Sequence, residues 1–173
     1  MQTPRGVART QGRAKQSSSA IVNPELHRLI AELEPASPDN LEVRLRFGLA
    51  CAARVKHLLE TPEALACLEE FGDLVRAQDF GSDLAALATR ADGLANRHQG
   101  SRSLDGVGHA AVSATYASAK AIAGKARQAA EYAAYAAVYG QGGYGATTDP
   151  SAYEPEQQWQ AEHLRELLSR RRV

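Results

Sequence analysis

An alanine-rich stretch constrains the fold of this chain more than any other feature. Residues 110–138 contain fourteen alanines in twenty-nine positions. Alanine has the highest helix propensity of all residues, and its small side chain lets neighbouring helices approach closely. β-branched residues are scarce along the chain, which disfavours strands. We therefore predict an all-α fold, with helices over about 104–122 and 125–139 and a break at Gly124.

The flanking sequence predicts further helices of the same bundle. Three helix starts are marked by a proline with a capping or acidic residue beside it: Asn23-Pro24, Pro38-Asp39 and Thr61-Pro62. Leucines at helical spacing follow each of them. The predicted helices cover about 24–34, 40–60, 62–78, 83–97 and 155–170. A chain of 173 residues suits one domain, so we predict a single bundle of six to seven helices over residues 24–173.

The net charge of zero conceals a strong segregation of charge. Residues 1–23 hold four basic residues and no acid, residues 165–173 carry +3, and residues 24–164 sum to −7. An acidic body repels nucleic acid and attracts a basic protein partner, although the acids can equally serve solubility alone. We predict no nucleic-acid binding. The polar residues 1–23, with almost nothing large to bury, are predicted to form a disordered basic tail.

Cysteine usage and hydropathy favour a cytoplasmic protein. Cys51 and Cys67 lie within apolar stripes of predicted helices, which predicts two buried free thiols, with a disulfide between helices as the alternative. No stretch approaches the roughly 18 apolar residues of a membrane span. The sequence also lacks a hydrophobic signal core near its start. We expect no membrane association.

The sequence carries no recognisable motif for catalysis, metal binding or cofactor binding. Gly140, Gly142 and Gly145 match the letters of a dinucleotide-binding motif, but they follow a predicted helix instead of a strand. We therefore predict a loop over residues 140–151. The sequence contains no Glu-x-x-His pair of the kind that holds iron in helical bundles. The sequence predicts no cofactor, no metal and no enzymatic activity.

A few side chains remain as candidates for partner binding. Three tyrosines fall on one face of the second alanine-rich helix, where each ring can be buried with its hydroxyl in water. The single tryptophan is either a core anchor or an interface hot spot. One histidine near the start of an alanine-rich helix is expected to bond a neighbour, with a direct role as the alternative, and another should be exposed or half-buried. These candidates are Gly108, His109, Tyr132, Tyr135, Tyr139, Trp159 and His163.

Three segments together resemble a known family. They are Leu45-Arg46-Phe47-Gly48-Leu49-Ala50-Cys51-Ala52-Ala53-Arg54-Val55, then Gly108-His109-Ala110-Ala111-Val112, and then Trp159-Gln160-Ala161-Glu162-His163-Leu164. Their order and spacing, over about residues 41–168, resemble the immunity-protein-five-like family of predicted all-α immunity proteins from bacterial polymorphic toxin systems. That family tends to carry further histidines after the Gly-His-Ala, where this chain has Thr115, Tyr116 and Ala119.

The resemblance implies a protein that protects its producer by binding a cognate toxin. The expected mechanism is stoichiometric occlusion of the toxin's active site by an acidic, aromatic-bearing helix surface, and a basic nuclease would complement such a surface. Two other hypotheses stay open. One is a structural or adaptor protein, for example a homodimer formed through the alanine-rich helices, and the other is an enzyme that uses His109 with an acidic partner. The sequence leaves the oligomeric state open.

Overall fold

The computed structural model describes residues 21–34, 37–98 and 107–171, and every regular element in this part of the chain is helical. In chain order the elements are α1 (Pro24–Leu33), α2 (Pro38–Arg54), η1 (Lys56–Leu58), α3 (Pro62–Ala77), α4 (Ser82–Arg97), α5 (Val107–Ile122), α6 (Ala126–Thr147), η2 (Pro150–Tyr153) and α7 (Glu154–Arg171). The η elements are short 3-10 helices. The prediction of an all-α bundle is confirmed.

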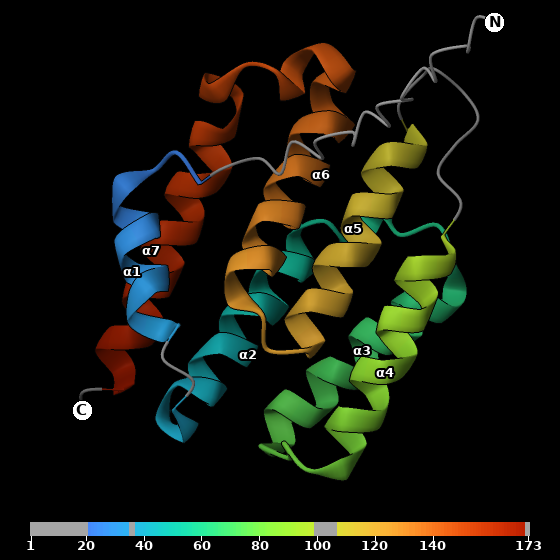
Figure 1. Cartoon of the computed structure of the whole chain (residues 1–173), viewed down its shortest axis with the longest axis vertical. Coiled ribbons are helices and arrows are strands. Elements are labelled where there is room, and N and C mark those ends of the chain that lie inside the picture. Colours follow the sequence, from blue (N-terminus) through green and yellow to red (C-terminus); the bar gives the residue numbers. More distant parts are fainter. Residues whose placement is uncertain (1–20, 35–36, 99–106, 172–173) are drawn as a thin grey trace, which may run out of the picture.

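The α5–α6 hairpin forms the centre of the bundle, with α3 and α4 on one side and α1 and α7 on the other, while α2 packs behind it (Figure 1). Gly124 makes the turn of the hairpin with a φ of 68°, which confirms the predicted break. Twelve alanines of the two helices are at most 5% exposed: Ala110, Ala111, Ala114, Ala117, Ala119, Ala121, Ala126, Ala129, Ala130, Ala133, Ala134 and Ala136. The close packing that motivated the homodimer hypothesis is therefore used inside the chain.

Helix α2 crosses α5 at unusually short range. A Cβ atom built on Gly48 would lie 2.9 Å from the Cα atom of Ala121 and 3.0 Å from its Cβ atom. Real Cβ atoms essentially never come this close to backbone. Glycine on α2 and alanine on α5 are therefore both required for the two helix axes to approach in this way.

Two predicted boundaries are wrong. Helix α2 ends at Arg54 instead of near residue 60, because Val55 leaves the helical region and η1 tightens the chain. Helical structure extends to Thr147 through most of the predicted loop, but Gly143, with a φ of 69° and a ψ of −165°, kinks it, so α6 consists of two helical pieces. Gly140 lies within the first piece, where a Cβ atom would come 3.3 Å from Leu58. This glycine marks a close approach between elements and not a turn.

The predicted caps of α1 and α3 are confirmed. The Asn23 side chain accepts a hydrogen bond from the Leu26 backbone N–H, and the Thr61 hydroxyl accepts one from the Ala64 N–H. Residues 1–20 of the predicted tail lie outside the described residues. Residues Val22 and Asn23 belong to the folded part, because the buried Oε1 of Gln157 accepts hydrogen bonds from both of their backbone N–H groups at 3.0 and 2.9 Å.

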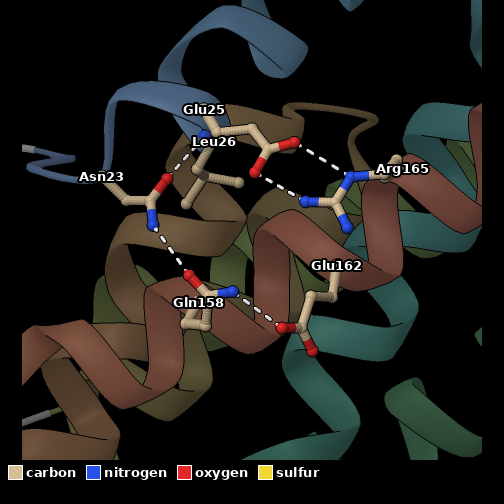
Figure 2. Close-up of polar contacts among 6 residues, drawn as sticks. All are labelled: Asn23, Glu25, Leu26, Gln158, Glu162 and Arg165. Carbon is tan, nitrogen blue, oxygen red and sulfur yellow. Dashed lines mark hydrogen bonds and ion pairs between the residues drawn. The ribbon is translucent and has the colours of Figure 1, made fainter.

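Helix α1 is joined to α7 by polar contacts along its edge (Figure 2). The guanidinium of Arg165 donates two hydrogen bonds, at 2.9 and 2.6 Å, to the carboxylate of Glu25. These bonds lower the pKa of Glu25 below its ordinary value. The amide of Asn23 donates to Gln158, which in turn donates to Glu162 at 2.7 Å. The first and last helices of the bundle are thus fastened side by side.

The buried Gln157 gives a direct test of this attachment. Replacing Gln157 by alanine leaves the Val22 and Asn23 N–H groups without their acceptor, which removes about 1–3 kcal/mol of local stabilisation. We expect hydrogen exchange at these two amides to accelerate at least about tenfold relative to the α5 amides. The matched control is Gln158→Ala, because that exposed side chain contacts no backbone N–H. Unchanged protection in Gln157→Ala would contradict the attachment.

Candidate interaction surface

Two of the three segments that carry the family resemblance make direct contact, through Arg54 at the end of α2 and Trp159 of α7. The first turns of α5 and α7 and the C-terminal part of α6 lie at one end of the bundle, uppermost in Figure 1, and the last turn of α2 lies behind and below them. Gly140 of α6 faces both Leu58 of η1 and Ala110 of α5, so these elements touch there. Arg54, at the end of α2, reaches α7. We call this region the upper end.

A cluster of four side chains joins α2 to α7 at the upper end. Arg54 donates from Nε to both carboxylate oxygens of Glu156, at 3.0 and 2.9 Å, and its Nη2 lies 2.8 Å from Oε2. The same guanidinium lies 4.1 Å from the ring centre of Trp159, and His163 stacks on Trp159 at 5.1 Å with an angle of 7° between the rings. We name these four residues the Arg54–Trp159 cluster.

Burial is uneven within the Arg54–Trp159 cluster. The side chain of Glu156 is 8% exposed and that of Arg54 is 40% exposed, so the carboxylate depends on the guanidinium as its partner. Trp159 is half-buried and packs against the core formed by α1, α2 and α6. Trp159 therefore anchors α7 to the core and keeps part of its ring exposed, while its alternative role as an interface hot spot stays a prediction. Burial lowers the pKa of the half-buried His163, while the nearby Glu166 raises it and Arg170 lowers it further.

A second aromatic group lies at the start of α5. The exposed ring of His109 contacts the buried ring of Tyr139 at 5.4 Å, and Tyr135 lies 5.8 Å from Tyr139. Gly108 precedes His109 in the first turn of α5. Within the described ranges His109 makes no ion pair, so the structure offers no acidic partner for it there.

The third predicted tyrosine is separated from the other two. Tyr132 stacks on Tyr116 of α5 at 5.1 Å, and the Tyr116 hydroxyl donates to Asn96 of α4 at 3.1 Å. Tyr132 therefore has different neighbours from Tyr135 and Tyr139, although the sequence places all three on one helical face. Residues on one face of α6 can therefore contact different neighbours, because different side chains pack along the two edges of that face. Sequence reasoning also missed Tyr116, Arg54 and Glu156, although Arg54 lies within one of the segments that carry the resemblance.

Tyr153 of η2 provides a test of packing near Tyr135. Its ring is buried against Ala134 and Val138, and its hydroxyl donates to the Thr147 carbonyl at 3.0 Å. Burial raises the pKa of Tyr153 from 10.0 to about 12. The unfolded chain therefore loses this proton at lower pH than the folded protein does. Below pH 10 this group does not affect stability, and between about 10 and 12 the free energy of unfolding falls as pH rises.

We expect the Tyr153→Phe variant to lose part of this alkaline fall in stability. The measurement is urea unfolding at about pH 9 and about pH 11, on either side of the ordinary tyrosine pKa. Tyr144→Phe is the matched control, because Tyr144 is 69% exposed. An equal pH dependence in the Tyr153→Phe variant and the wild type would contradict the raised pKa.

Cys51 and Cys67 are buried free thiols, as predicted, and burial raises the pKa of Cys51 well above its ordinary value. The described residues contain no group of three or more side chains suited to hold a metal ion. None of the helices in the described part is long and apolar enough to cross a membrane.

Part of the acidic excess lies on α3 and on the turn before it. Three ion pairs neutralise some of the acids of this region: Glu70 with Arg90, Asp73 with Arg76, and Asp92 with Lys120. Glu60, Glu63 and Glu69 are exposed and make no ion pair with any described residue. Leu65, on the same exposed side of α3, is 37% exposed. Glu60 and Glu63 follow η1 directly, so the uncompensated charge adjoins the upper end.

Comparison with known proteins gives no assignment. A scan against protein-family models, a search of curated proteins and a search of solved structures each found no match. The resemblance to the immunity-protein-five-like family therefore stays a prediction from the three segments.

Proposed function

We propose that this protein is an immunity protein that neutralises a cognate bacterial toxin by stoichiometric binding. One observation carries the proposal. The first and third of the segments that resemble the immunity-protein-five-like family are far apart in the sequence, yet Arg54 of the first packs on Trp159 of the third at the upper end. A shared binding surface gives such segments a reason to occur together.

The chemistry of the upper end supports a protein partner. Tryptophan, tyrosine and arginine are the residue types most enriched among interface hot spots. Trp159 and His163 are half-buried, and His109 is exposed. Each can gain contacts when a partner covers it, while Glu156 holds Arg54 in a fixed position beside the tryptophan ring.

The charge near the upper end supports a basic partner. The carboxylates of Glu60, Glu63 and Glu69 have no cation among the described residues, and complementary charge speeds the encounter of two proteins. A toxin with a basic active-site surface, such as a nuclease, would carry the positive charge that complements these carboxylates. Twelve alanines of α5 and α6 are buried within the chain, so no observation favours the homodimer alternative over toxin binding.

The proposal is tested with any candidate toxin that is encoded beside this gene. We expect co-expression of this protein to restore growth of cells that produce the toxin, and the purified pair to co-elute in gel filtration. The double variant Trp159→Phe, His163→Ala should bind at least about tenfold more weakly, as expected when hot-spot contacts are lost. Phenylalanine keeps most of the core packing of Trp159, so the fold is expected to survive, with helical circular dichroism as the check.

The matched control is His27→Ala, which removes an exposed histidine on α1 and should leave binding unchanged. Absence of both rescue and complex would overturn the proposed function. Full-strength binding by the double variant, or an equal loss in His27→Ala, would show that the upper end is not the contact surface.

A further inference from the structure

A cleft lies at the end of the bundle opposite the upper end. It is bounded by the last residues of α1, the first half of α2 and the start of α6, and its volume is about 300 Å³. Ile30 and Leu33 lie behind its wall and are at most 1% exposed. Arg44, Lys125 and Arg127 supply three cationic side chains, against the single carboxylate of Glu34, so the lining carries a net positive charge.

The positive charge is only partly neutralised from within the described chain. Arg127 donates from Nε to Glu34 at 2.5 Å. The half-buried Glu131 also lies in the field of Arg127 and Glu34, and its burial raises its pKa. Both nearby carboxylates, those of Glu34 and Glu131, therefore interact with Arg127. Arg44 and Lys125 make no ion pair with any described residue, which leaves two cations in the cleft without a counter-charge.

Arg44 shows most directly that an acceptor is missing. Its Nε atom is buried and has no hydrogen-bond partner. A buried donor without an acceptor is destabilising by about 1–3 kcal/mol, and more when the group is charged. The guanidinium group is a planar fork whose N–H groups match the paired oxygens of a carboxylate or phosphate. An oxyanion in the cleft would give this group a partner.

The start of α6 adds backbone donors to the same cleft. Its N-cap residue Lys125 makes no side-chain capping bond, and no acidic residue lies in the first turn. The helical ladder begins with the Ala129 N–H, which donates to the Lys125 carbonyl. The N–H groups of the preceding residues and the positive end of the helix dipole are therefore left to act on the cleft, which Ala126, Arg127 and Gln128 line.

We propose that this cleft binds a phosphate group, either as free inorganic phosphate or attached to a small molecule. Arg44 provides bidentate contacts and Lys125 provides a point charge. A ligand held in this way links α2 to α6 and stabilises the fold by mass action. The site lies away from the upper end and does not depend on the proposed immunity function.

The experiment is a titration of the full chain followed by amide NMR shifts. The probes are inorganic phosphate and phenyl phosphate, with chloride at matched ionic strength as the reference. We expect saturable shifts at the amides of Ala126, Arg127 and Gln128 with both phosphates and not with chloride. Arg44→Gln should weaken binding at least about tenfold, the size expected for the loss of a charge-assisted pair. Tighter binding of phenyl phosphate would identify a phosphorylated small molecule as the ligand, and equal binding would identify the free oxyanion.

Two variants keep the result interpretable. Lys56→Gln removes an exposed cation on η1, outside the cleft, and should bind phosphate like the wild type. Arg44→Lys keeps the charge without the fork, so we expect an affinity between those of the wild type and Arg44→Gln. Linear shifts without saturation, or equal losses in Arg44→Gln and Lys56→Gln, would overturn the proposal. Wild-type affinity in a folded Arg44→Gln protein would overturn it as well.

Discussion

Replacing Gly48 by valine is expected to destabilise the protein by about 3 kcal/mol, the upper part of the usual range for overpacking. A Cβ atom at this position meets the Cα atom of Ala121 at 2.9 Å, so the obstacle is backbone and not a flexible side chain. Valine adds two methyl groups beyond that Cβ atom, and α2 and α5 must separate to admit them. The measurement is the urea midpoint with its slope, compared with the wild type.

The matched control for this prediction is Gly72→Ala on α3. A Cβ atom there meets only the Nη1 atom of Arg76, at 3.4 Å, and that group can move aside. Alanine has the higher helix propensity, so we expect this variant to gain up to about 1 kcal/mol. If valine at Gly48 were tolerated as well as alanine at Gly72, the close crossing of α2 and α5 would be wrong.

Removing the guanidinium from Arg54 is expected to have a comparable effect. In the Arg54→Ala variant the carboxylate of Glu156 stays buried with no cation beside it, and breaking a buried pair in this way costs about 3 kcal/mol. The side chain also loses its contact with the Trp159 ring. We expect a lower urea midpoint and a change in tryptophan fluorescence, because Trp159 is the single tryptophan of the chain.

A second substitution separates the charge effect from the packing effect. Glu156→Gln removes the buried charge and keeps the size of the side chain, so the double variant Arg54→Ala, Glu156→Gln should recover about half of the lost stability. The exposed pair Arg28–Glu32 supplies the control, since Arg28→Ala should change stability by less than about 0.5 kcal/mol. A loss in Arg54→Ala as small as that of the control would contradict the dependence of Glu156 on Arg54.

The sequence predicts most of the fold because the signals it uses are local. Asn23 and Thr61 cap their helices as expected, and Gly124 breaks the alanine-rich region where it should. The wrong helix boundaries arise where a contact with a residue distant in the sequence determines the local structure. Gly140 looks like part of a glycine-rich loop, but it lies inside α6 with Leu58 close beside it, and the chain kinks only at Gly143. Local propensity carries no information about which neighbour a glycine will meet.

The candidate site is less predictable than the fold, for a related reason. Trp159 and His163 lie one turn apart on α7, so their proximity follows from helical spacing. Arg54 approaches Trp159 from another helix, about a hundred positions away in the sequence, and no local sequence pattern predicts such a contact. Periodicity places Tyr132 on one helical face with Tyr135 and Tyr139, but the packing of α5 against α6 pairs Tyr132 with Tyr116.

The attachment of α1 to α7 has a consequence for the order in which the chain can fold. Val22 bonds to Gln157 across 135 positions, and Glu25 bonds to Arg165 across 140. While the chain is being made, the apolar side of α1 can contact α2 and α6 but therefore lacks its main partner until α7 has emerged from the ribosome. Closing so long a loop is slow, and it leaves apolar surface uncovered in the meantime. During synthesis, α1 is thus the helix for which a chaperone would have the longest opportunity to bind.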